Sequence, residues 1–223
     1  MSSKELQDLA DGLTIVPIGL DYPVMARNRK SQIIDVATVL IARRGYGQTS
    51  VDEVIREAGL GGKGHFYHYF KSKEELGQAV LSRQFEHFVE RGLAILREPM
   101  IDPFERLNLF IDAVVASHAE RGCQGGGPCG AFATEMAEAH ETFRRTLDNV
   151  FERWSEQIQA LLWEARPRLR DDVDITRLSR FVIATLEGAL LMSRVKREIT
   201  VMEGIAADLK RFVAMHVREG VAV

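Results

Sequence analysis

The sequence predicts an all-α protein in which a small three-helix unit at the N-terminus precedes a longer helical body. Three observations lead to this fold class. Apolar residues recur at intervals of three and four along most of the chain, which is the spacing of one helix face. The sequence has no alternating Val/Ile/Thr-rich run of useful length, so strands are not expected. Two capping-box sequences and several glycines and prolines mark the ends of the expected helices.

The N-terminal unit is expected to follow a flexible arm at residues 1–25, which two glycines and two prolines interrupt. Its first helix is expected at 28–44, with Gly45 ending it. One face of that helix carries apolar residues at helical spacing, namely Ile33, Ala37, Leu40 and Ile41.

The second and third helices of this unit are expected to be short. The capping box Ser50-Val-Asp-Glu53 opens the second, which ends at Gly59, and the third occupies 63–70 after a glycine-rich turn. This arrangement has the outline of a helix-turn-helix, in which the later helix enters the DNA major groove. We therefore expect a helix-turn-helix DNA-binding domain at 26–76, followed by a second helical domain at 77–223.

The body is expected to begin with a long helix that the capping box Ser72-Lys-Glu-Glu75 starts. The predicted helices of the body span about 72–97, 102–121 and 128–137, then a long helix that carries Phe143 to Leu161 and ends before Arg166, then 173–196 and 200–217, which brings the total to nine. The helix at 173–196 is apolar or small on almost every side, more than a peripheral helix needs. A homodimer through the last two helices would cover the surplus, and a helix that is central in one chain is the alternative.

Composition bounds the class of protein. The 223 residues are 46% hydrophobic and 27% charged, which fits an ordinary soluble protein, and no apolar run approaches the length of a membrane span. The first residues do not resemble a secretion signal, so a cytoplasmic location is expected. Two cysteines, Cys123 and Cys129, are expected as free thiols.

Charge is distributed unevenly. Residues 27–75 hold nine Lys and Arg against six Asp and Glu, whereas the rest of the chain holds 20 against 26. A basic head on an acidic body suits a protein whose head meets a polyanion. A solvated helical face is the alternative interpretation of the same charges.

The stretch 61–76 combines histidines, lysines and aromatic residues. A metal site is not favoured, because His65 and His68 are three residues apart and have no further ligand at suitable spacing. If Phe66 and Phe70 face the core, the remaining polar side chains face outward, where they suit phosphate oxygens and base edges better than packing.

The same stretch resembles the DNA-binding domain of TetR-family transcriptional repressors. The resemblance covers about residues 27–78, and its most specific part is Lys63-Gly-His-Phe-Tyr-His-Tyr-Phe-Lys-Ser-Lys-Glu-Glu-Leu76. One departure is an extra glycine at 61 or 62, which places seven residues between Gly59 and Tyr67 where the family usually has six. The resemblance implies a homodimeric repressor that binds a palindromic operator and needs no cofactor or metal.

The resemblance also implies the roles of individual residues. Phosphate contacts fall to Thr49, Ser50, Tyr69 and Lys73. The groove-facing set is Lys63, Gly64, His65, Tyr67 and His68. A small-molecule effector would bind among the middle helices. The candidates for lining its cavity are Phe110, Val114, His118, Phe132, Met136, Trp154 and Trp163, and an ordinary core position is the favoured alternative for most of them.

Cys129 is a candidate sensor of a different kind. It follows Pro128 at an expected helix N-terminus, where the helix dipole stabilises a thiolate. The segment Gly127-Pro-Cys-Gly-Ala-Phe-Ala-Thr-Glu135 resembles, more weakly, part of the repressors that respond to electrophiles of the N-ethylmaleimide and acrylate types. Cys123 would then be a resolving thiol. A small buried cysteine without reactivity is the alternative.

Two other classes of function remain to be weighed against a regulator. A helical enzyme would have to use His118, Glu135 and His140 as acid-base groups, but these form no nucleophile-base set in the sequence. A helical adaptor that binds another protein would show no salt-sensitive affinity for DNA.

Overall fold

The computed structural model is all-helical and describes residues 28–123, 135, 137 and 140–218. The helices are α2 (Arg29–Arg44), α3 (Val51–Glu57), α4 (Lys63–Tyr69), α5 (Lys73–Leu96), α6 (Pro103–Glu120), α8 (Glu141–Glu164), η1 (Arg166–Arg168), α9 (Ile175–Lys196) and α10 (Ile199–Ala214). Eight predicted helices are therefore confirmed. The helix predicted at 128–137 and the arm at 1–25 lie outside the described residues.

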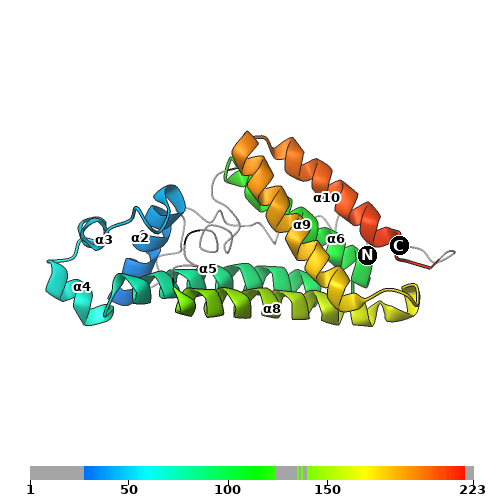
Figure 1. Cartoon of the computed structure of the whole chain (residues 1–223), viewed down its shortest axis with the longest axis horizontal. Helices are drawn as coiled ribbons and strands as arrows, with labels where there is room; N and C mark the ends of the chain where they lie inside the picture. Colours follow the sequence, from blue (N-terminus) through cyan, green and yellow to red (C-terminus); the bar gives the residue numbers. More distant parts are fainter. Residues whose placement is uncertain (1–27, 124–134, 136, 138–139, 219–223) are drawn as a thin grey trace.

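Two long helices, α5 and α8, lie side by side and join a head formed by α2, α3 and α4 to a body formed by α6, α9 and α10 (Figure 1). They run in the same direction, because Gly77 lies against Phe143 near their first turns and Arg97 donates to Gln157 near their ends. The predicted boundary between residues 76 and 77 falls within α5, and that division of the chain stays a prediction.

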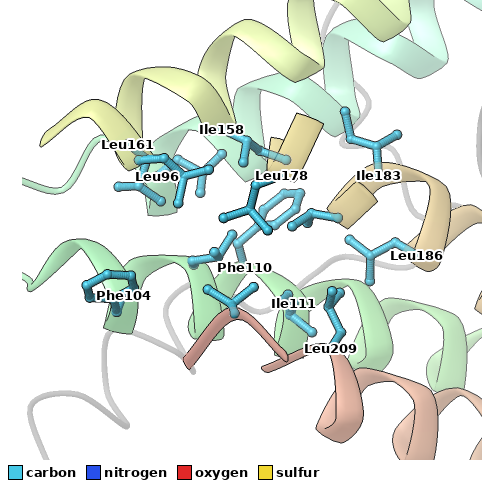
Figure 2. Packing of buried hydrophobic residues seen from close by; sticks show 14 of the residues in the cluster. Leu96, Phe104, Phe110, Ile111, Ile158, Leu161, Leu178, Ile183, Leu186 and Leu209 are labelled. Atoms are coloured by element: carbon cyan, nitrogen blue, oxygen red, sulfur yellow. The ribbon is translucent and has the colours of Figure 1, made fainter. Parts of the chain in front are cut away.

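The interior contains two hydrophobic clusters. The head cluster contains Phe66, Phe70 and Val80, and α8 adds Phe143, Leu147 and Val150 to it. The body cluster, shown in Figure 2, draws Leu96, Phe110, Ile158 and Leu186 from four different helices. Phe151 of α8 packs against both clusters.

The end of α10 differs from its prediction. The sequence predicts a helix to residue 217, but α10 ends at Ala214. The next residues pair with the η1 segment instead: Arg170 N donates to His216 O at 2.9 Å, and Arg218 N donates to Arg168 O at 2.9 Å. A pairing across almost fifty residues therefore replaces the last helical turn.

The last two helices leave apolar side chains exposed in the single chain. α9 buries Val182 and Leu186 in the body, while the exposed apolar residues of α9 and α10 are Phe181, Leu191, Met192, Val195 and Phe212. The rings of Phe181 and Phe212 lie 4.5 Å apart, so the two helices share this apolar surface.

Candidate DNA-binding surface and sensor region

The outer face of α4 is polar and its inner face is aromatic. Phe66 is 0% exposed and Phe70 is 1% exposed, and their ring centroids lie 5.8 Å apart. The predicted groove-facing set, Lys63, Gly64, His65, Tyr67 and His68, is exposed throughout. The orientation of these side chains agrees with the sequence-based expectation, whereas their contact with DNA stays a prediction.

The additional glycine lies in the turn between α3 and α4. Leu60 N donates to Ile55 O and Gly59 N donates to Arg56 O, which closes α3 with a Schellman motif. Gly59 has φ of 61° and Gly62 has φ of 134°, values that side chains other than glycine rarely adopt. Gly62 is the N-cap of α4, so the helix begins at Lys63 without a side-chain cap.

The start of α3 exposes one of the two residues that the sequence predicts there as phosphate contacts, and that contact stays a prediction. Ser50 is exposed, and its Oγ accepts from Glu53 N at 3.1 Å as the helix cap. Thr49 differs from Ser50, because its side chain is only 3% exposed, and its predicted phosphate contact is not supported by this position. Its Oγ1 donates to Gly45 O at 2.9 Å and its amide donates to Tyr46 O, so both donors serve the loop instead.

Lys73 and Tyr69 flank the same surface and are only partly exposed. Lys73 Nζ lies 4.4 Å from the Tyr46 ring centroid and donates to Gly47 O at 3.2 Å. Burial lowers the pKa of Lys73, and the opposite charge of Glu135 acts to raise it. Lys73 therefore connects the start of α5 to the loop before α3.

In the body, three of the residues predicted to line an effector cavity belong to the packed core. Phe110, Val114 and Trp154 are all buried there, and the Phe110 and Trp154 ring centroids lie 6.2 Å apart, edge to face. The prediction for Trp163 is wrong, because it is 60% exposed on the outer face of α8. Phe132, Met136 and Cys129 lie outside the described residues.

Two family descriptions match the two parts of this arrangement. "Bacterial regulatory proteins, tetR family" matches residues 33–80, which hold the head, and "Transcriptional regulator LmrA/YxaF-like, C-terminal domain" matches residues 103–208 of the body. The chain belongs to the TetR family. It is a DNA-binding transcriptional regulator with a helix-turn-helix head, and proteins of this family are regulators and not enzymes.

Relatives within the TetR family agree along most of the chain. The HTH-type regulator in the lacX 3' region of Lactococcus lactis is 28% identical over 177 residues, 79% of this chain and 89% of that protein. AcuR of Cereibacter sphaeroides is 28% identical over 158 residues, 70% of this chain and 72% of its own. The transcriptional repressor NemR of Escherichia coli is 22% identical over 191 residues, 83% of this chain and 94% of its own.

Solved structures of TetR-family proteins share the fold. A regulator from Chloroflexus aurantiacus superposes with a TM-score of 0.75 at 28% identity, covering 85% of this chain and 96% of its own. The reduced form of Escherichia coli NemR superposes with a TM-score of 0.77 at 20% identity, covering 88% of this chain and 100% of its own.

The acid-base groups that a helical enzyme would have to use, His118, Glu135 and His140, each contact a different partner in this structure. His118 Nε2 lies 2.7 Å from Ser193 Oγ, His140 Nδ1 lies 3.9 Å from Glu74, and Glu135 accepts from Gly47. Among the residues that the structure describes, no group of three or more His, Cys, Asp or Glu side chains is placed to hold a metal ion. No helix in these same ranges is long and apolar enough to cross a bilayer.

His118, in the last turn of α6, and Cys123, three residues after the helix ends, are both buried. His118 is fully buried, and its desolvation, followed by the charges of Arg121 and Arg194, lowers its pKa. Cys123 is 6% exposed, and its amide donates to His118 O at 3.1 Å, so the backbone fixes it beside that histidine. A resolving role for Cys123 would require this end of α6 to open.

Sequence reasoning missed two ionisable groups in the body. Glu187 of α9 is partly buried, and its Oε1, which is itself buried, has no hydrogen-bond partner among the described residues. Burial raises the pKa of Glu187 to about 7. Arg121 is similar, since its Nε has no partner in the described part of the chain and burial lowers its pKa. The only signal for Glu187 was a lone acid within the apolar run of 186–190.

Proposed function

We propose that this regulator is a homodimeric repressor whose two α4 helices bind adjacent major grooves of a palindromic operator. The observation that carries the proposal is the two-sided α4, in which buried Phe66 and Phe70 hold Lys63, His65, Tyr67 and His68 on the exposed side. Lysine supports phosphate contact, and histidine and tyrosine supply donors for phosphate oxygens or base edges. Ser50, Tyr69 and Lys73 extend the same surface toward the DNA backbone.

Dimerisation rests on the exposed apolar surface of α9 and α10. Leu191, Met192 and Val195 lie on the last two turns of α9, and each is more than half exposed in the single chain. A large apolar surface of this kind is typical of a protein–protein interface. A second copy of the chain would cover it and would present two recognition helices together, as a palindrome requires.

Release from the operator is proposed to follow a small-molecule effector or a thiol modification in the body. Three observations support this part: the resemblance of the segment around Cys129 to electrophile-responsive repressors, the similarity to the repressor NemR, and the similarity to a structure of NemR in its reduced form. Buried polar groups such as His118 also give the body a means of recognising a ligand.

The test is selection of binding sites from a random pool of DNA duplexes by the full-length protein, repeated after treatment with N-ethylmaleimide. We expect enrichment of a palindrome, and its loss after treatment. Cys129→Ser should keep the palindrome and abolish the response to the reagent, while Cys123→Ser should keep both.

Each alternative gives a different result. If the same palindrome is enriched with and without N-ethylmaleimide, thiol modification is excluded as the release signal, and a reversibly bound effector is left. Failure to enrich any sequence at low salt would contradict DNA recognition and favour the adaptor, because phosphate contacts strengthen as salt is lowered.

A further inference from the structure

Glu135 brings the body into contact with the loop between α2 and α3. It precedes α8 in the chain, yet its carboxylate accepts a hydrogen bond from Gly47 N at 3.0 Å, across 88 residues of sequence. Gly47 belongs to the loop that leads into Ser50, the cap of α3. One side chain of the body therefore holds the entry to the helix-turn-helix.

The loop is shaped around this carboxylate. Gly45 has φ of 85°, and a Cβ built there would lie 2.4 Å from Glu135 Oε1, so a larger residue at this position would have to displace the carboxylate. A Cβ at Gly47 would lie 3.8 Å from Oε2, which is ordinary van der Waals contact. The fit is close at the first glycine and open at the second.

Two further contacts connect the same loop to α5 and α8. Lys73 of α5 donates to Gly47 O, so the two polar groups of Gly47 are held by side chains of opposite charge. Tyr46 packs edge to face on Phe143 of α8, with ring centroids 5.4 Å apart. The Gly45–Gly47 loop is therefore held by one residue of α5, one residue of α8 and Glu135.

We infer that Glu135 is a positioning residue for DNA binding, which acts by fixing the Gly45–Gly47 loop and, through it, the N-terminus of α3. A loop that is already ordered loses less conformational entropy when its neighbours bind, so this contact strengthens operator binding. The inference deepens the proposed function and rests on it, because the binding that Glu135 strengthens is that of the proposed operator.

The first experiment measures hydrogen exchange of the Gly47 amide by NMR in full-length protein labelled with ¹⁵N-glycine. Gly47→Ala removes the signal of Gly47 and so assigns it. We expect Glu135→Ala to accelerate this exchange at least threefold, because the acceptor is lost. Glu135→Gln keeps an acceptor oxygen and should remain within about twofold of the original chain. Glu141→Ala is the matched control, since Glu141 pairs with Arg144 and Arg145 at 2.8 and 2.9 Å and should leave Gly47 unchanged.

The second experiment titrates the same variants with the selected operator by fluorescence anisotropy. Glu135→Ala is expected to weaken binding at least fivefold, Glu135→Gln to restore most of the affinity, and Glu141→Ala to match the original chain. Unchanged exchange at Gly47 in Glu135→Ala would overturn the contact. Faster exchange with unchanged operator affinity would overturn the positioning role. If the original chain selects no operator, the proposed function fails, while the exchange measurement still decides whether the contact exists.

Discussion

The head and the body place their ionisable groups in opposite ways. On α4 of the head, Lys63, His65 and His68 are exposed over two buried phenylalanines. In the body, His118 is fully buried, and Glu187 is partly buried, with a pKa raised to about 7. Exposed groups remain available to a polyanion at little cost, whereas buried ones must be desolvated before they can be charged. The head is thus built to contact a charged partner, and the body carries groups whose state depends on their surroundings.

The largest expected effect is on the buried side of α4. Phe66→Ala removes a fully buried ring and should lower the free energy of unfolding by about 3–5 kcal/mol. Tyr67→Ala, one residue away and 52% exposed, should change stability by no more than about 0.5 kcal/mol while weakening operator binding. Urea unfolding followed by circular dichroism separates the two, and equal losses of stability would contradict the two-sided helix.

A second test concerns the proposed dimer surface on α9 and α10 of the body. Leu191→Glu places a charge on the exposed apolar face of α9 and should convert the dimer into monomers in sedimentation velocity. Because two linked half-sites bind far more tightly than one, operator affinity should fall by about 100-fold or more. Glu203→Gln, at an exposed position of α10, is the control. A Leu191→Glu protein that remains dimeric would place the interface elsewhere.

The third test uses the raised pKa of Glu187. Its pKa in the folded protein, about 7, lies above the ordinary value of 4.5, so the folded state holds this proton more tightly than the unfolded state. The associated stability is present below pH 4.5 and is lost as the pH rises through 7. Glu187→Gln should therefore be more stable than the original chain at pH 8, on the order of 1–3 kcal/mol, with the advantage shrinking toward pH 5. Urea unfolding at both pH values measures it, and an advantage independent of pH would refute the assignment.

The smallest expected effect is the loss of stability when a helix cap is removed, and it can be compared between the head and the body. Ser50 caps α3 in the head, and Asp174 caps α9 in the body by accepting from Arg177 N at 3.0 Å. Each change to alanine should lower stability by about 1 kcal/mol in thermal melts. Only Ser50→Ala should also weaken operator binding, because only Ser50 lies on the proposed DNA surface. Equal effects on the operator would remove Ser50 from that surface.

Local signals made the head predictable. Capping boxes, glycines and the four-residue spacing of Phe66 and Phe70 are encoded within a few residues of the structures that they form, so the helices and the outward face of α4 follow from the sequence. Thr49 was the exception, because its hydroxyl bonds to Gly45 O within a loop whose shape the sequence pattern does not specify.

The body was less predictable because its details depend on distant partners. The end of α10 is set by pairing with 168–170, and the exposure of Trp163 depends on which face of α8 its neighbours leave uncovered. The contact of Glu135 with Gly47 joins residues 88 positions apart, and no local pattern identifies it.

The sharing of α5 and α8 between the two clusters has a consequence for protein engineering. The head cluster is completed by Phe143, Leu147 and Val150, which come from far along the chain. A fragment that stopped at residue 80 would leave the apolar surface beneath these side chains open to water. A chimera that transfers this DNA specificity to another regulator therefore needs to carry the first turns of α8 together with the head, so that the transferred segment includes the side chains that cover its apolar core.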